Sequence, residues 1–138
     1  MRTDSRLSRV LHALLHLAEM DRPATSEHIA QMLRTNSAVV RRMMSGLRQA
    51  GIVASVKGHG GGWTLEKPLT QITLLEIYHA LGPPQLFAIG NDEDEPACLL
   101  AKASNQATKQ ALRAAQQEFE RSLSAQTVAQ LAARVCDG

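Results

Sequence analysis

Residues 35–65 read TNSAVVRRMMSGLRQAGIVASVKGHGGGWTL and contain the patterns of a helix and of a glycine-rich hairpin. The first half of this stretch places apolar residues at the three- and four-residue steps of a buried helix face. These residues are Val40, Met43, Met44 and Leu47. Gly51 suits the position just after a helix C-terminus. The second half holds two short runs, 52–56 and 62–66, with β-branched and aromatic residues around the five residues 57–61. We therefore expect a helix followed by a β-hairpin.

A shorter helix is expected just before this one. Thr25 or Ser26 can act as its N-cap, and its apolar face consists of Ile29, Ala30 and Leu33. Residues 34–36 then form the link to the longer helix, for which Asn36 or Ser37 is the cap. Two helices joined by a turn of about three or four residues, with the longer one second, are typical of a helix-turn-helix.

Three further helices are predicted around this unit. The first spans residues 6–19, with an apolar face of Leu7, Val10, Leu11, Leu14, Leu15 and Ala18. The second begins after Thr73 and ends at Leu81, before Gly82 and two prolines. The third runs from about residue 97 to 122 without glycine or proline and carries a narrow apolar stripe. That stripe consists of Leu100, Ala103, Ala107, Ala111, Ala114 and Phe119.

The long helix exceeds what a core of this size can cover, since about 25 residues span roughly 38 Å. Its alanines allow another helix to approach closely. We therefore expect the stripe to be a dimer interface with a second copy, the alternative being that it packs only on its own domain.

The glycine-rich loop admits four interpretations. A phosphate loop needs Lys-Ser/Thr after its last glycine at the start of a helix, whereas here Trp63 and a strand follow. The dinucleotide-binding fingerprint fails for the same reason. A metal site would need ligands near His59, and the loop offers none. The remaining interpretation is a flexible hairpin tip whose Lys57 and His59 contact a DNA backbone or minor groove.

Composition and charge fit a nucleic-acid partner. The chain has 138 residues, 44% of them hydrophobic, with one Trp, one Tyr and two Phe, which favours a mainly helical domain. Residues 1–67 hold ten Lys/Arg against five Asp/Glu, and residues 68–138 hold five against eight. The two cysteines are far apart, and no apolar run could span a bilayer. We expect a cytoplasmic protein without a membrane partner.

The longer helix of the helix-turn-helix, which ends before Gly51, carries the predicted recognition surface. Ser37, Arg41, Ser45 and Arg48 lie opposite its apolar face, with Arg42 at the margin. Arginine can pair bidentately with guanine in the major groove, and serine can contact bases or phosphates. The full predicted DNA-binding set is Ser26, Asn36, Ser37, Arg41, Arg42, Ser45, Arg48, Lys57, His59 and Gly60. The alternative is a solvated cationic helix face.

The run from Thr35 to Leu65 contains the motifs Leu-x-x-Ala-Gly-Ile-Val and Gly-Gly-Gly-aromatic. It resembles the corresponding segment of the Rrf-type winged helix-turn-helix regulators. Residues 72–77 resemble that family's segment after the wing. The resemblance implies a mainly α fold with a small β-hairpin wing and a long helix that pairs two subunits. It implies a winged-helix domain in residues 1–82, an acidic loop in 83–97, and a dimerisation helix with a short C-terminal helix in 98–138.

The chain departs from the cluster-binding members of that family. They carry three cysteines in the loop and at the start of the long helix, and only Cys98 matches. We therefore expect no cofactor, no metal and no iron-sulfur cluster. Cys98 stays a candidate redox sensor, because a helix N-terminus lowers a thiol pKa while a neighbouring acidic run raises it. The alternative is a buried inert thiol.

These patterns predict a homodimeric transcription regulator, a repressor that binds a double-stranded DNA operator and responds to an unidentified redox or nitrosative signal. The alternative function is a winged-helix module that binds proteins and not DNA. An enzyme is not expected, because no spacing recommends Cys98 with any histidine as nucleophile and base.

Overall fold

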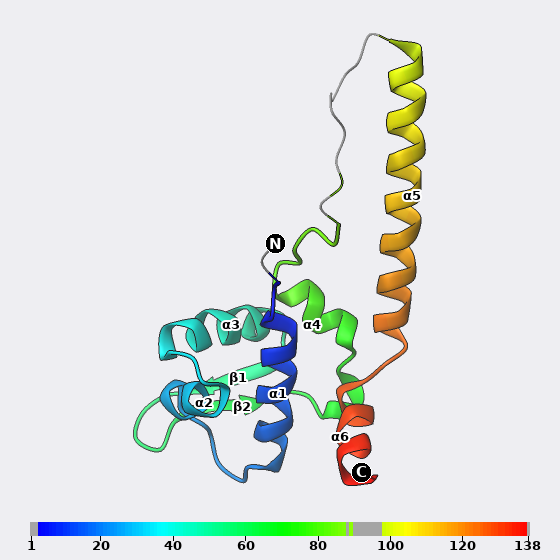
Figure 1. Ribbon diagram of the computed structural model, residues 1–138. Helices are drawn as coiled ribbons and strands as arrows, with labels where there is room; N and C mark the ends of the chain where they lie inside the picture. The colour runs from blue at the N-terminus through cyan, green and yellow to red at the C-terminus, as the bar shows by residue number, and fades with distance from the viewer. Residues whose placement is uncertain (1–2, 88, 90–97, 138) are drawn as a thin grey trace.

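The computed structural model describes residues 3–87, 89 and 98–137 (Figure 1). Its helices and strands follow in the order α1 (Arg6–Glu19), α2 (Ser26–Leu33), α3 (Ser37–Gln49), β1 (Val53–Val56), β2 (Gly62–Leu65), the 3-10 turn η1 (Leu69–Gln71), α4 (Leu74–Ala80), α5 (Leu99–Ser124) and α6 (Val128–Asp137). This confirms the predicted fold class. Most of the predicted acidic loop, 83–97, lies outside the described residues.

Three side-chain caps fix where helices begin. Thr25 accepts a hydrogen bond from the backbone amide of His28 at 3.1 Å, which makes Thr25 and not Ser26 the cap of α2. Asn36 accepts in the same way from Val39 at 3.0 Å and begins α3. Thr73 begins α4. Each cap satisfies an amide that has no partner within its own helix.

The buried face of α1 differs from the predicted one. Val10, Ala13, Leu14 and Leu17 are buried, whereas Ala18 is exposed. The prediction that Ala18 belongs to the apolar face is wrong, because the helix turns Leu17 toward the core and alanine contributes too little apolar area to decide the register.

The core joins both ends of the chain. Its buried side chains come from α1 to α4 and β1, and from Leu123 and Val128 near the C-terminus. The amide of Val128 donates to the carbonyl of Ile72 at 2.9 Å, and that of Leu74 donates to Gln126 at 3.0 Å. Figure 1 shows α6 returning beside the body that contains α1. The predicted division into residues 1–82, 83–97 and 98–138 stays a prediction. In the structure, α6 packs on the N-terminal unit.

A two-stranded antiparallel sheet forms the hairpin, with Val53 opposite Leu65 and Val56 opposite Gly62. Ala24, between α1 and α2, adds a bridge to Trp63 through backbone hydrogen bonds of 2.7 and 3.0 Å. The Trp63 indole donates to the Ser26 hydroxyl at 2.9 Å, and its ring packs against the core. Trp63 therefore anchors the return strand β2 to the core.

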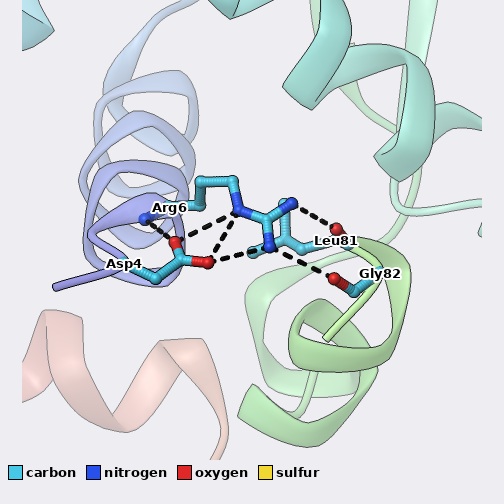
Figure 2. Close-up of polar contacts among 4 residues, drawn as sticks. All are labelled: Asp4, Arg6, Leu81 and Gly82. Carbon is cyan, nitrogen blue, oxygen red and sulfur yellow. Dashed lines mark hydrogen bonds and ion pairs between the residues drawn. The ribbon is translucent and has the colours of Figure 1, made fainter. Parts of the chain in front are cut away.

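A polar contact attaches the start of α1 to the end of α4 (Figure 2). The Arg6 guanidinium donates to the carbonyls of Leu81 at 2.7 Å and Gly82 at 3.2 Å. It also pairs with the Asp4 carboxylate at 2.8 Å, and these hydrogen bonds lower the pKa of Asp4. Because the carbonyls at a helix C-terminus lack partners within the helix, a cation there stabilises the end of α4.

The long helix α5 leaves this body and extends well beyond it (Figure 1). Its 26 residues measure about 39 Å, and Leu123 is its one buried residue. Phe119 contacts the Tyr78 ring of α4 edge-on, with centroids 5.4 Å apart. Phe119 therefore belongs to the face that packs on its own domain. Assigning it to the same stripe as the alanines is wrong, because it lies roughly a third of a turn away from them.

Candidate nucleic-acid interface

The turn between α2 and α3 sets the angle of the predicted recognition helix. Arg34 adopts a left-handed conformation, with φ 55°, and its amide donates to the carbonyls of Ala30 and Gln31. The Thr35 amide also donates to Ala30, at 2.9 Å. Asn36 then caps α3 through its side-chain oxygen, which leaves its amide nitrogen available to a ligand. These bonds hold α3 against α2.

The exposed face of α3 differs somewhat from the predicted one. Arg41, Arg42 and Arg48 are exposed, whereas Ser37 and Ser45 are half-buried. Placing Arg42 at the margin is therefore wrong. Ala38 and Gln49 are also exposed, and they were missed. Helical spacing alone indicates that Ala38, Arg42, Ser45 and Gln49 lie on one side of α3, because they recur at three- and four-residue steps.

Close packing on the opposite side of α3 keeps this face turned outward. A Cβ atom on Gly46 would lie 2.8 Å from the carbonyl oxygen of Ala80 in α4. Val40, Met43, Met44 and Leu47 are buried beside it. The helix can approach α4 this closely only because Gly46 has no side chain, so the packing fixes which residues of α3 face solvent.

Arg41 has an acidic neighbour across the turn. Its guanidinium lies 3.5 Å from the carboxylate of Glu27 on α2, and both side chains are more than half exposed, at 56% and 69%. An ion pair this long and this open contributes about 0–1 kcal/mol. Arg41 can therefore exchange Glu27 for a phosphate or a base at little cost.

The hairpin tip presents a cation, a histidine and backbone amides. Lys57 and His59 are both exposed. Gly60 has a φ of 77°, a conformation that side chains disfavour, and the space around it is open. Gly62 is needed for a different reason, because a Cβ there would lie 2.5 Å from the carbonyl oxygen of Ala24. One glycine thus shapes the tip and the other admits the bridge to Ala24.

Ser26, a predicted DNA contact, already has a hydrogen-bond partner within the chain. It is half-buried at the start of α2, and its hydroxyl oxygen accepts from Trp63. A serine hydroxyl that accepts one hydrogen bond can still donate its own proton. The same contact links α2 to the hairpin, so that the structure brings the start of α2, the face of α3 and the hairpin into one unit.

Cys98 occupies the N-cap position of α5 and is exposed. The alternative of a buried inert thiol is therefore wrong for the single chain. Interactions of the sulfur with the backbone amides of Ala101 and Leu100 lower the pKa of the Cys98 thiol. The acidic run expected to raise it, 92–95, lies outside the described residues. A lowered pKa gives more thiolate, which is the reactive form.

Within the described part of the chain, no helix is both long enough and apolar enough to traverse a lipid bilayer.

A helix-turn-helix packed against a two-stranded hairpin defines the winged helix-turn-helix class. The Rrf2 family, described as iron-dependent transcriptional regulator, matches residues 3–134. YwnA of Bacillus subtilis, named as a candidate HTH-type transcriptional regulator, is 35% identical over 126 residues, which are 91% of this chain and 92% of that protein. The chain therefore belongs to the Rrf2 family of transcriptional regulators, and the family is not an enzyme family.

Solved structures agree with this assignment. The crystal structure of a candidate DNA-binding protein is 30% identical, covers 92% of this chain and 98% of its own, and has a TM-score of 0.74. CymR, the global cysteine regulator of B. subtilis, shares the fold at 23% identity, with 97% and 98% coverage and a TM-score of 0.65. IscR of T. potens shares it at 19% identity, with 98% and 88% coverage and a TM-score of 0.70.

Proposed function

We propose that this chain is a homodimeric repressor that acts in the cytoplasm and reads a near-palindromic DNA operator through α3 and the hairpin. The proposal rests on exposed residues of two neighbouring elements: the arginines of α3 and Lys57 and His59 of the hairpin are all exposed, and α3 packs on β1. In the proposed complex, Arg41, Arg42 and Arg48 contact bases or nearby phosphates, while Lys57 and His59 contact the backbone or minor groove. Two copies would place their recognition helices roughly 34 Å apart, or a multiple of it.

The α5 surface supports the second copy. Leu99 and Leu100 are 79% and 83% exposed, and the alanines at 103, 107, 111 and 114 are exposed as well. Phe87 and Ile89 add apolar area beside the same helix, along a surface groove that includes Ala107 and Ala111. Contiguous exposed apolar area of this kind marks an interface. An alanine surface lets a second helix approach closely.

The operator is the first thing to identify. DNA retained by the purified protein is sequenced from a fragment pool, and the enriched site is then used in binding titrations. We expect a repeated half-site whose spacing matches the two recognition helices. Retention of no particular sequence would contradict operator reading. Binding that also fails to weaken as salt is raised would favour the alternative of a protein-binding winged helix.

The same titrations separate two kinds of contact. Arg41→Ala should cost about 1–3 kcal/mol on the enriched site if Arg41 pairs with a guanine. Lys57→Ala should weaken binding to all sequences alike and reduce the salt slope by about one unit. Lys109→Ala on α5 removes one positive charge away from this surface and serves as the control. Unchanged binding by an Arg41, Arg48 and Lys57 triple alanine variant would contradict the assigned surface.

The family description raises the question of iron, and the donor set does not fit a cysteine-ligated cluster. The whole chain has two cysteines, whereas such clusters are held mainly by three or four thiolates. Cys98 is exposed at the start of α5, whereas Cys136 belongs to α6, which follows the C-terminal end of α5. We propose a regulator without such a cluster. Visible absorption and stoichiometric iron in anaerobically purified protein would contradict this.

The signal we propose is oxidative or nitrosative, with Cys98 as its target. Its exposure and lowered thiol pKa support this role. Peroxide or a nitrosothiol should weaken operator binding by the unmodified protein, and Cys98→Ser should remove the response. A response that persists in Cys98→Ser, or no response at all, would exclude Cys98 as the sensor.

A further inference from the structure

Two histidines on α1 share one side of the helix and point at each other. His12 and His16 are four residues apart, so successive turns bring their side chains together. Their Nε2 atoms are 2.9 Å apart, and the ring planes are tilted by 46°. His12 is exposed and His16 half-buried, so solvent reaches the pair. Neither residue takes part in the surface proposed to bind DNA.

Two Nε2 atoms this close require a proton or a cation between them. Each imidazole nitrogen is either a hydrogen-bond donor or a lone-pair acceptor, and two lone pairs at this distance would repel each other. A shared proton is one solution, with one ring donating to the other. A metal cation is the other solution, because it accepts both lone pairs at once. Neutral imidazole Nε2 is among the commonest metal ligands in proteins.

The distances suit a transition-metal ion. With Zn–N bonds of about 2.0–2.1 Å, two nitrogens 2.9 Å apart subtend roughly 90° at the metal, and opening the pair by about 0.5 Å gives the tetrahedral angle. Two histidines at i and i+4 on one helix face are also the pair that binds zinc in the His-Glu-x-x-His motif. Here the spacing is His-Ala-Leu-Leu-His, without the glutamate that acts as a base in that motif.

We propose, in place of the expectation from the sequence that no metal binds, that His12 and His16 form a two-ligand site for a divalent transition metal of the imidazole-preferring class, with Zn²⁺ as the representative ion. No third histidine, cysteine or carboxylate completes the pair within the residues whose side chains are described. Water or an external ligand therefore fills the remaining positions. Along α1, Arg9 lies one turn before His12 and Glu19 one turn after His16, so that one charge of each sign flanks the pair.

The site is tested with the full, tag-free chain, freed of metal by chelation and titrated with Zn²⁺ against a chromophoric competitor. We expect one Zn²⁺ per chain. Replacing one histidine, in His12→Ala or His16→Ala, should weaken binding about tenfold or more, because the second imidazole is otherwise held at a high effective concentration. His28→Ala removes an exposed histidine of α2 outside the pair and should bind Zn²⁺ as the unmodified chain does.

A second measurement guards against effects on folding. Zn²⁺ bound across one turn of α1 stabilises the folded state, so it should raise the melting temperature of the unmodified chain and of His28→Ala. The increase should be absent from the double variant His12→Ala/His16→Ala, whose helical content is checked by circular dichroism. Mg²⁺ should have no effect on any of them, because it prefers oxygen ligands. Equal Zn²⁺ affinity in the double variant and the unmodified chain, or no Zn²⁺ binding by the unmodified chain, would overturn the proposal. Neither measurement involves DNA, so the outcome is independent of the proposed repressor function.

Discussion

At the scale of single residues, the environment of Cys98 has a consequence for its reactivity. The backbone amides of Ala101 and Leu100 lower the pKa of the thiol, so a larger fraction is thiolate at any pH below its ordinary value. In a Cys136→Ser background, alkylation by iodoacetamide should reach half its maximal rate at a lower pH in the folded chain than in the same chain unfolded in urea. Coincident profiles in the two states would contradict the structural cause of the shift.

Residue identities on α3 show what the sequence could and could not predict. The buried residues of α3 follow from their spacing and are confirmed, and the structure selects Asn36 rather than Ser37 as the cap. The exposed face is only partly predicted, because charge identifies Arg41 and Arg48 but not the exposed uncharged residues Ala38 and Gln49. The pairing of Arg41 with Glu27 could not be predicted, since it depends on the angle between α2 and α3.

At the scale of elements, the contact between α3 and α4 depends on Gly46. Gly46→Val would place its Cβ 2.8 Å from the Ala80 carbonyl and force the helices apart. We expect the free energy of unfolding to fall by about 1–3 kcal/mol, the usual cost of overpacking. Valine is a better helix former than glycine by less than about 1 kcal/mol, so the clash decides the sign.

Urea unfolding of the two proteins measures this difference. Gln49→Val introduces the same side chain on the exposed face of α3 and should change stability by less than about 1 kcal/mol, because it meets no backbone and costs only helix propensity. Equal effects at positions 46 and 49 would show that the close approach of α3 to α4 is unimportant.

The hairpin was predicted from its residues, but its attachment was not. Alternating β-branched residues and the glycines around 57–61 indicate two strands, which the structure confirms as β1 and β2. The bridge from Ala24 to Trp63 involves a single residue pair and has no periodicity of its own. Such a contact depends on how α1 and α2 are placed, which a local pattern does not encode.

At the scale of the whole molecule, the proposed dimer depends on the exposed alanine stripe of α5. Ala114→Glu would place a charge within the exposed alanine stripe, and an unpaired charge buried at an interface is strongly unfavourable. We expect this variant to sediment as a monomer at concentrations where the unmodified chain is a dimer, and to lose affinity for a two-half-site operator. Gln106→Glu adds the same charge on another side of α5 and should leave the dimer intact. A dimer that tolerates Ala114→Glu would contradict the assigned interface.

The packing of α6 on the N-terminal unit could not be predicted from any local sequence pattern. The length of α5 was predictable because no glycine or proline interrupts it. The return of α6 to the core was not, since Val128 is one apolar residue among several near the C-terminus and gives no sign of its distant partner Ile72. The chain thus closes its N-terminal unit with its last helix, and α5 is fixed to that unit near its C-terminal end.

In the proposed DNA-binding surface, the Glu27 carboxylate competes with DNA for the guanidinium of Arg41. If Arg41 moves to a guanine, Glu27 loses its partner and its carboxylate is left facing a polyanion. That repulsion applies to every sequence, whereas the two hydrogen bonds of an arginine to guanine form only on the right one. Glu27 therefore lowers affinity for the operator and for ordinary DNA by the same factor. Selectivity then comes from the hydrogen bonds to guanine alone, and Glu27 limits how tightly non-operator DNA is held.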